Sequence, residues 1–464
     1  MYMDLQNAHR VPVATLWNRC IVPTAFQGET AALLAELFAF CLLLNFVSCL
    51  KFLPRITVPL TSSFLGLLIT IRWFDFQLSL CLVSFALLAY IFLYIWSSIR
   101  SRSSNYWPAQ YVMLDAEKFS KLRGSLMILI MKIISLSFDH EFLSEKSDYI
   151  DIVDYCGYVF NVATIKFGPW YSFQAHKQFM ERYLISFFGL CCSPDESIAS
   201  TFRGFIFLFI AFVCLIMSSC FIDWLIFDEY IYYTKYIVGY KEATSFRFSH
   251  YFICFVSESA VLLTGNFLLS REDSRNDNYA DKSRIRRYLE PRVCNPLSIE
   301  FPRSLTNVVV SWNIPMHNWL KMYAFRPSLP RGKFFAIIFT YIASSALHGF
   351  NFSISAVLLS LGLYTYAEYV LREKLSRSFD ACIRARKCSN CEHKHKNTNV
   401  FVLVCNLGFL CLSVFHLIYL GMIFDSGDEQ EQGYSSQHVW RKWNDYNFLS
   451  FYVGLGTFVF AIIV

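Results

Sequence analysis

One histidine in this chain lies in a setting that is typical of a catalytic base inside a membrane. His348 separates two apolar runs, residues 334–347 and 352–370, and Gly349 follows it directly. An ionisable side chain among membrane-buried residues is energetically costly, so it indicates a function and a polar partner. Imidazole has an ordinary pKa of about 6.5 and is suited to take the proton from a hydroxyl nucleophile. The structural alternative is a packed histidine that bonds a backbone carbonyl.

A polar residue upstream is a candidate partner for this histidine. Asn313 lies in the segment Ser311-Trp-Asn-Ile-Pro-Met-His-Asn-Trp-Leu320, where Pro315 breaks regular structure and Trp312 suits a membrane interface. An amide at this position could donate a hydrogen bond to a developing oxyanion or orient a second substrate. The alternative is an ordinary turn residue before Ile-Pro. We expect Asn313 to approach His348 from the cytoplasmic side.

Other ionisable residues in or near apolar segments have structural interpretations of equal or greater weight. His416 and Glu258 lie inside apolar segments, and His250 and His317 lie near expected membrane interfaces. We interpret His416 as a cavity-lining or a structural histidine, and Glu258 as a functional carboxylate or a hydrogen-bond anchor. His250 and His317 are weaker candidates.

The motif Cys388-x-x-Cys391-x-His393-x-His395 has the residue types and close spacing of a zinc site. We nevertheless favour solvated loop residues without a metal. Zinc, a disulfide or an acylated cysteine remain alternatives.

The sixteen cysteines do not form a disulfide framework by their spacing. Many lie inside apolar segments, where a thiol behaves as a small hydrophobic group. These are Cys41, Cys49, Cys81, Cys214, Cys220, Cys254, Cys405 and Cys411. The pair Cys191-Cys192 is a weak candidate for S-acylation.

The composition indicates an integral membrane protein that spans the bilayer several times. The chain has 464 residues, of which 55% are hydrophobic and 16% charged, whereas soluble domains carry roughly 25% charged residues. The net charge of +6 is spread over loops without a basic stripe, so we expect no nucleic-acid partner. We also expect no cleaved signal peptide before Thr30.

Apolar segments predict about eight to eleven transmembrane or re-entrant helices, because a span needs about 20 apolar residues. Eight clear candidates are residues 31–50, 76–96, 205–227, 251–269, 334–347, 352–370, 400–424 and 448–464. Three further segments are short or carry a lysine: residues 58–71, 125–138 and 155–173.

Loop charges predict the orientation of the second half of the chain. Residues 271–333 and 372–396 are rich in lysine and arginine, so both should be cytoplasmic, whereas the acidic loop after Phe424 should be lumenal. The apolar segments between the two basic loops then form a helical hairpin with His348-Gly349 at its tip. A helix of about fifteen residues rises roughly 22 Å, so the tip should lie inside the membrane.

Several motifs make the chain similar to the membrane-bound O-acyltransferase family, and in particular to members that acylate Wnt proteins. The pattern is an Asn in Trp-Asn-x-Pro followed by an intramembrane His-Gly. The matching segments are Leu122-Arg-Gly124, Met131-Lys132, Phe167-Gly-Pro-Trp170, Asn295-Pro-Leu-Ser-Ile-Glu-Phe-Pro-Arg-Ser304, Ser311 to Leu320, Ser345 to Phe350, Val370-Leu-Arg-Glu-Lys-Leu375 and Phe415-His-Leu-Ile-Tyr-Leu-Gly421.

The resemblance implies an all-α polytopic fold around a reaction tunnel, as one membrane domain over residues 1–464 with a catalytic core at about 122–424. It implies transfer of palmitoleoyl, a monounsaturated acyl group, from palmitoleoyl-CoA to a serine hydroxyl of Wnt proteins in the endoplasmic reticulum membrane. His348 and Asn313 would be catalytic, and Trp312 with Asn313 would contact acyl-CoA. Membrane lipids are further partners. No permanently bound cofactor or metal is expected.

Two other functions remain open from the residues alone. Within the same family, the acceptor could be a lipid or another secreted peptide. In a different class, the chain could be a polytopic transporter or receptor, which would bind a solute without consuming a thioester. The sequence lacks the paired broken helices in two related halves that are typical of many transporters.

Overall fold

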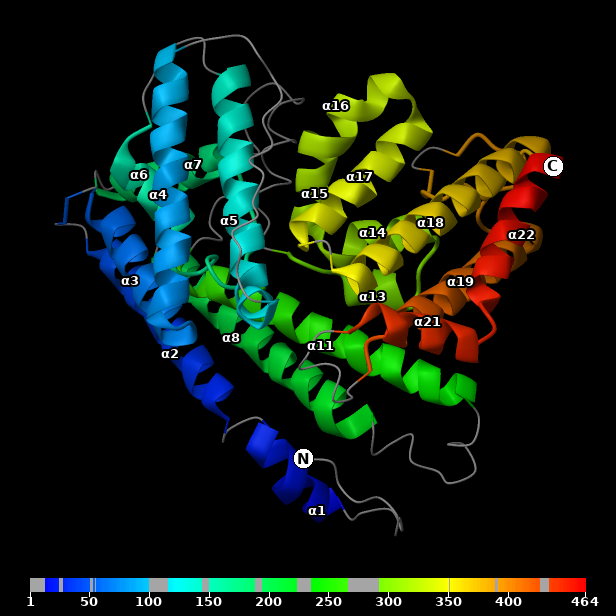
Figure 1. Ribbon diagram of the computed structural model, residues 1–464, viewed down its shortest axis with the longest axis horizontal. Helices are drawn as coiled ribbons and strands as arrows, with labels where there is room; N and C mark the ends of the chain where they lie inside the picture. The colour runs from blue at the N-terminus through cyan, green and yellow to red at the C-terminus, as the bar shows by residue number, and fades with distance from the viewer. Residues whose placement is uncertain are drawn as a thin grey trace. The chain divides into compact units, whose positions relative to one another are not determined.

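The computed structural model describes residues 13–24, 28–50, 53–54, 56–99, 116–143, 150–187, 194–222, 235–265, 292–349, 351–388, 391–425 and 434–464. These residues form helices and connecting segments (Figure 1). Among them, β-structure is limited to an isolated bridge between Ala381 and His395. The all-α prediction is therefore confirmed.

Five of the described helices are long and apolar enough to cross a membrane. They are α2 (Glu29–Cys49), α4 (Phe76–Ile99), α8 (Pro194–Ile216) continued by η3 (Met217–Phe221), α18 (Phe352–Ser378) and α19 (Val400–Gly421). The pair α21 (Ser436–Asp445) and α22 (Leu449–Ile463) is bent by 74° and adds a sixth if it is one broken span. These helices confirm a multi-pass membrane protein.

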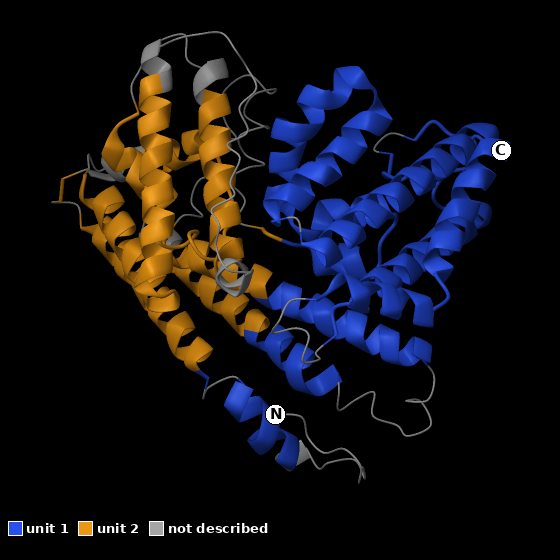
Figure 2. Ribbon diagram, in the orientation of Figure 1, with its two compact units in different colours: residues 1–28, 212–252, 294–464 blue, residues 29–211, 253–293 orange. Residues whose placement is uncertain are grey.

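One compact unit comprises residues 29–211 and 253–293 (Figure 2). Its remaining helices are α3 (Thr57–Trp73), α5 (Ala116–Leu143), α6 (Ile152–Val159), α7 (Phe173–Phe187) and the last part of α11 (Lys235–Leu263). Helix α3 packs so closely on the end of α6 that a Cβ at Gly66 would collide with the carbonyl oxygen of Phe160. The contact explains why a glycine is needed there.

The expected membrane segment 155–173 is not one continuous helix. Helix α6 ends at Val159, and the chain then continues in turns until α7 begins at Phe173. The buried ammonium group of Lys132 on α5 donates to the carbonyl oxygen of Tyr158 at 2.6 Å and to Oγ1 of Thr164 at 2.8 Å. Lys132, in the apolar segment 125–138, therefore satisfies carbonyl groups that the end of α6 leaves without helical partners.

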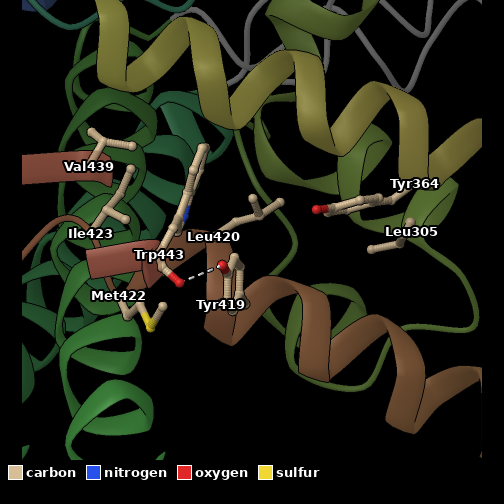
Figure 3. Close-up of a cluster of buried hydrophobic side chains, with 8 residues drawn as sticks. All are labelled: Leu305, Tyr364, Tyr419, Leu420, Met422, Ile423, Val439 and Trp443. Atoms are coloured by element: carbon tan, nitrogen blue, oxygen red, sulfur yellow. Dashed lines mark hydrogen bonds between the residues drawn. The ribbon is translucent and has the colours of Figure 1, made fainter. Parts of the chain in front are cut away.

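The other compact unit comprises residues 1–28, 212–252 and 294–464. Its core includes eight buried residues (Figure 3), where the hydroxyl of Tyr419 donates to the carbonyl oxygen of Trp443 at 3.3 Å. The eight are Leu305, Tyr364, Tyr419, Leu420, Met422, Ile423, Val439 and Trp443. They tie α18, α19 and α21 to the start of α14 (Leu305–Trp312).

The same unit corrects our interpretation of Cys220 as a small hydrophobic group. Cys220 forms a disulfide with Cys20, and their Cα atoms lie 5.9 Å apart. The pairing joins η1 (Trp17–Ile21) to η3, 200 residues apart in the sequence. Spacing along the chain cannot reveal such a pair. The pair Cys191-Cys192 lies outside the described residues.

Accessibility labelling tests the predicted membrane orientation. Cysteines introduced at Arg331, in the exposed turn before α17 (Lys333–Leu347), and at Lys387 should react with a membrane-impermeant maleimide from the cytoplasmic side. Cysteines at Arg284 and Glu429, which lie outside the described residues, should be labelled from the cytoplasm and the lumen respectively. The parent protein without introduced cysteines is the control. Labelling of Arg331 and Lys387 from opposite sides would contradict the orientation.

Candidate active site

His348 lies in a tight turn between two helices, as the sequence predicts. Helix α17 ends at Leu347, and His348 leaves the helical conformation with φ −82° and ψ 5°. Gly349 follows with φ +80°, a conformation that costs glycine little. Asn351 then caps the start of α18, with its Oδ1 accepting the backbone N–H groups of Ser353 and Ile354. The half-buried imidazole is thus held at the tip of the α17–α18 hairpin.

Asn313 lies between two short helices and caps the second. It follows α14 and precedes α15 (Ile314–Leu320), with φ −143° and ψ 90°. Its Oδ1 accepts the backbone N–H of Met316 at 3.1 Å, which is the usual contact of an asparagine N-cap. The carboxamide oxygen is therefore oriented toward the helix, and the amide Nδ2–H₂ is the side-chain group that can donate to a substrate.

A second helical hairpin brings Asn313 and His348 to the same end of the fold. From Ile314 the chain continues through α15, η5 (Lys321–Phe325), α16 (Arg326–Ser328) and η6 (Leu329–Arg331). It turns at Gly332, whose φ is +109°, and α17 runs back along α15, η5 and α16 (Figure 1). The first arm contains residues 314–331 and the second contains residues 333–347, so their lengths are similar. Asn313, directly before the first arm, and His348, directly after the second, therefore lie at the same end of this hairpin.

This arrangement corrects the expected approach of Asn313. We expected it to reach the hairpin from the cytoplasmic end, where Lys333 begins α17. Because residues 314–331 are helical and fold back along α17, Asn313 instead lies at the end opposite Lys333, with His348. The apolar pattern identified α17 and not its partner arm, which is interrupted by prolines and bases.

Trp312 is held by a residue that we ranked as a weak candidate. The ring of His250 on α11 stacks on Trp312, with centroids 4.1 Å apart and planes at 10°. Its Nε2 lies 2.9 Å from the carbonyl oxygen of Trp312, to which it donates. The Trp312 ring, which we expected to contact acyl-CoA, therefore packs against α11. His250 fixes the peptide next to Asn313. The two contacting residues are 62 positions apart in the sequence, so no local pattern reveals the contact.

The other end of α14 is fixed by buried polar groups. Oε2 of Glu368 on α18 accepts the backbone N–H of Leu305 at 2.7 Å, and Ser304 caps the helix. Arg372, one turn along α18, lies 3.6 Å from Glu368 and donates to Oδ1 of Asn406 on α19 at 3.0 Å. The carboxylate thus anchors α14 to α18, and α14 carries Asn313 at its far end.

Two of the remaining candidates, His416 and Glu258, have structural partners. Nδ1 of His416 lies 2.7 Å from Oγ of Ser450, and its ring stacks on Tyr364 with centroids 4.3 Å apart. Glu258 accepts the backbone N–H of Val293 at 2.5 Å, which agrees with a hydrogen-bond anchor. His317 lies within α15 and is half-buried.

The candidate metal ligands lie at the opposite end of α18 from His348. That helix has 27 residues and is therefore about 40 Å long. Cys388, Cys391 and His393 are close together there, whereas Nδ1 of His395 lies 3.3 Å from Nδ2 of Asn399. The metal candidates and the Asn313–His348 region are separate sites.

Comparison with known proteins identifies the family. The model of the membrane-bound O-acyltransferase family matches residues 60–389, a range that contains both Asn313 and His348. The protein-serine O-palmitoleoyltransferase porcupine of Homo sapiens is 33% identical over 479 aligned positions, covering 96% of each chain. The mouse protein of the same name is 34% identical over 75% of this chain and 74% of its own. Lysophospholipid acyltransferase 1 of Arabidopsis thaliana is 22% identical over 49% of this chain and 52% of its own. This chain belongs to the membrane-bound O-acyltransferase family.

Proposed function

We propose that this protein transfers palmitoleoyl from palmitoleoyl-CoA to a serine hydroxyl of Wnt proteins in the endoplasmic reticulum membrane. The observation that carries the proposal is the hairpin of α15 to α17, which brings Asn313 and His348 to one end. The palmitoleoyl group and the serine acceptor are taken from the names of relatives that match 96% and 75% of the chain. The Wnt acceptor and the location follow from the resemblance of the motifs.

His348 acts as the general base in this proposal. Its imidazole takes the proton of the serine hydroxyl as the serine oxygen attacks the thioester carbonyl. The resulting oxyanion collapses, the C–S bond breaks, and the imidazolium returns the proton to the CoA thiolate. The products are an O-acyl serine and CoA with a free thiol, and no acyl-enzyme forms.

Asn313 stabilises the acyl donor in the same step. Because its Oδ1 accepts the N–H of Met316, its Nδ2 group is oriented to donate. A hydrogen bond from Nδ2 either neutralises part of the oxyanion charge or fixes the thioester for attack. His250 and Glu368 are positioning residues for Asn313, acting through Trp312 and through the start of α14.

The depth of the site accounts for the use of two substrates from two compartments. Helix α17 has 15 residues, so its end lies about 22 Å from its start, within a hydrocarbon core of about 30 Å. With the Gly332 turn at the cytoplasmic surface, His348 and Asn313 lie deep in the membrane. Acyl-CoA then reaches them from the cytoplasm and the acceptor peptide from the lumen.

A lipid acceptor is the second candidate function, because lysophospholipid acyltransferases are also among the relatives. The purified protein should be supplied with palmitoleoyl-CoA and equal amounts of a Wnt-derived serine peptide and a lysophosphatidylcholine. We expect an ester on the peptide serine and none on the same peptide with Ser→Ala. Acylation of the lysophospholipid alone would replace the proposed acceptor. Binding without release of CoA would favour a transporter or receptor.

Removal of the His250 ring should lower turnover by disturbing Asn313. His250→Ala leaves the Trp312 carbonyl oxygen without its donor, which costs about 1 to 3 kcal/mol. If the transition state is destabilised by this amount relative to the bound substrates, kcat decreases roughly 5- to 150-fold. His250→Phe keeps a stacked ring without the donor, so its kcat should lie between those of the parent protein and His250→Ala.

The matched control is His416→Phe, which removes another stacked histidine of the same unit, one that is buried. The kcat of each folded protein should be measured with the acyl-CoA and peptide pair. Unchanged kcat in folded His250→Ala would contradict a positioning role.

A further inference from the structure

Among the described residues, four potential metal-ligating side chains gather at one point after α18. They are Cys382, Cys388, Cys391 and His393, and their ligand atoms all lie within 4.8 Å of one another. Cys382 is completely buried and the other three are half-buried. The sequence motif contains three of these residues; it also includes His395, which does not belong to this group, and it does not include Cys382.

We propose that these four side chains bind a structural Zn²⁺ ion. Three thiolates and one imidazole form a closed tetrahedral site of the kind that holds zinc structurally. Zinc bond lengths of about 2.3 Å to sulfur and 2.0 to 2.1 Å to nitrogen place the ligand atoms roughly 3.5 to 3.8 Å apart. Ligand atoms already within 4.8 Å reach this geometry through small side-chain movements. The proposal rests on this cluster and does not depend on the acyl acceptor.

A hydrogen bond outside the cluster prepares the histidine for a metal. Oγ of Ser376 donates to the carbonyl oxygen of Ala381 at 2.7 Å, which uses its hydrogen. It also lies 3.3 Å from Nε2 of His393, so it must accept there and Nε2 must carry the proton. The remaining nitrogen, Nδ1, keeps its lone pair and lies 3.3 Å from Sγ of Cys391. Metal-binding histidines are commonly oriented in this way.

The backbone around the cluster is held independently of the four ligands. The N–H of Cys382 donates to the carbonyl oxygen of His395 at 2.9 Å, and the N–H of His395 donates to that of Asp380 at 3.0 Å. The Asp380 carboxylate also accepts the N–H of Lys394 at 3.0 Å. These bonds hold the segment that contains Cys382 beside the segment that contains His395, with His393 two residues before it.

The charge and the compartment suit thiolate ligands. Zinc with three thiolates carries one net negative charge, which the basic residues of this loop balance: Arg384, Arg386, Lys387, Lys394 and Lys396. The same basic residues predict a cytoplasmic loop. Cytoplasmic thiols stay reduced, so they remain available to a metal rather than forming a disulfide.

The site connects structurally to the helix that carries Asn313. Arg303 donates to the carbonyl oxygens of Cys382 at 2.8 Å and Arg384 at 3.1 Å, and Oγ of Ser304 donates to that of Ala385 at 3.1 Å. Ser304 caps α14. A metal that fixes residues 382–388 therefore also fixes the start of α14, although it is remote from the reacting atoms.

Metal analysis of the purified full-length protein tests the proposal directly. We expect about one zinc per chain by mass spectrometry, falling well below half in Cys382→Ser and Cys391→Ser. His395→Ala and Cys411→Ser are matched controls and should keep their zinc, because neither residue belongs to the cluster. After chelation, added Co²⁺ should give the absorption of tetrahedral thiolate-bound cobalt in the parent protein and not in Cys391→Ser.

Three results would overturn the proposal. One is a parent protein without zinc that also fails to bind Co²⁺. Another is a disulfide between two of the three cysteines in the freshly purified protein. The third is loss of zinc in His395→Ala with retention in His393→Ala. Metal content is read without turnover, so failure of the acyl-transfer proposal would leave this result unaffected.

Discussion

Replacement of His348 by alanine is expected to lower acyl transfer by about 10²- to 10⁴-fold, the usual cost of losing a general base. The protein should remain folded, because the side chain is half-buried in a turn whose geometry depends on Gly349 and on the Asn351 cap. The rate of CoA release with acceptor peptide should be measured on detergent-purified protein that elutes as a single species. Near-normal turnover in folded His348→Ala would remove the proposed base.

Two further variants sharpen this prediction. His348→Gln keeps a polar side chain of similar size and should not restore activity, since an amide does not accept the proton. His416→Gln changes another histidine of the same unit, bonded to Ser450, and should retain turnover. Equal losses in both histidine variants would indicate a general effect on folding.

Replacement of Asn313 by alanine is expected to cost about 3 to 4 kcal/mol of transition-state stabilisation, or roughly 10²- to 10³-fold in rate. Residual activity should remain because His348 is intact. The loss should appear in acyl-CoA affinity or turnover, with binding of the Wnt peptide nearly unchanged. Both ligands should be measured separately on the purified variant. Selective loss of peptide binding would place Asn313 on the acceptor side of the reaction.

The cap made by Asn313 requires a separate control. Asn313→Asp keeps an oxygen that can accept the Met316 N–H, but its carboxylate has no hydrogen to donate. If donation is the role of Asn313, Asn313→Asp should be as impaired as Asn313→Ala. Recovery of activity in Asn313→Asp would show that the cap, and not the donor, is what the reaction needs.

The predictable part of the site rests on local patterns. Two apolar runs separated by His348-Gly349 predicted the α17–α18 turn, which the structure contains. The spanning helices α2, α4, α8, α18 and α19 were likewise predicted from continuous apolar composition. In each case the determining residues are neighbours in the sequence, so the period and the length of a segment identify it.

The parts that the sequence did not predict depend on contacts between distant residues. His250 stacks on Trp312, Cys20 bonds to Cys220, and the group of potential metal ligands contains Cys382 rather than His395. None of these partners is related by helical or motif spacing. The orientation of Asn313 depended on whether residues 314–331 form a helix, and the prolines and bases there concealed the helical arm.

The central claim is most directly tested by a single-turnover experiment with equal amounts of purified protein and labelled palmitoleoyl-CoA, with and without a Wnt-derived peptide. Mass spectrometry should find one palmitoleoyl ester on the peptide serine for each CoA released, and no acyl group on the protein before the peptide is added. The ester should be absent with His348→Ala. An acylated protein intermediate, or ester formation by His348→Ala at the parent rate, would contradict direct transfer by His348.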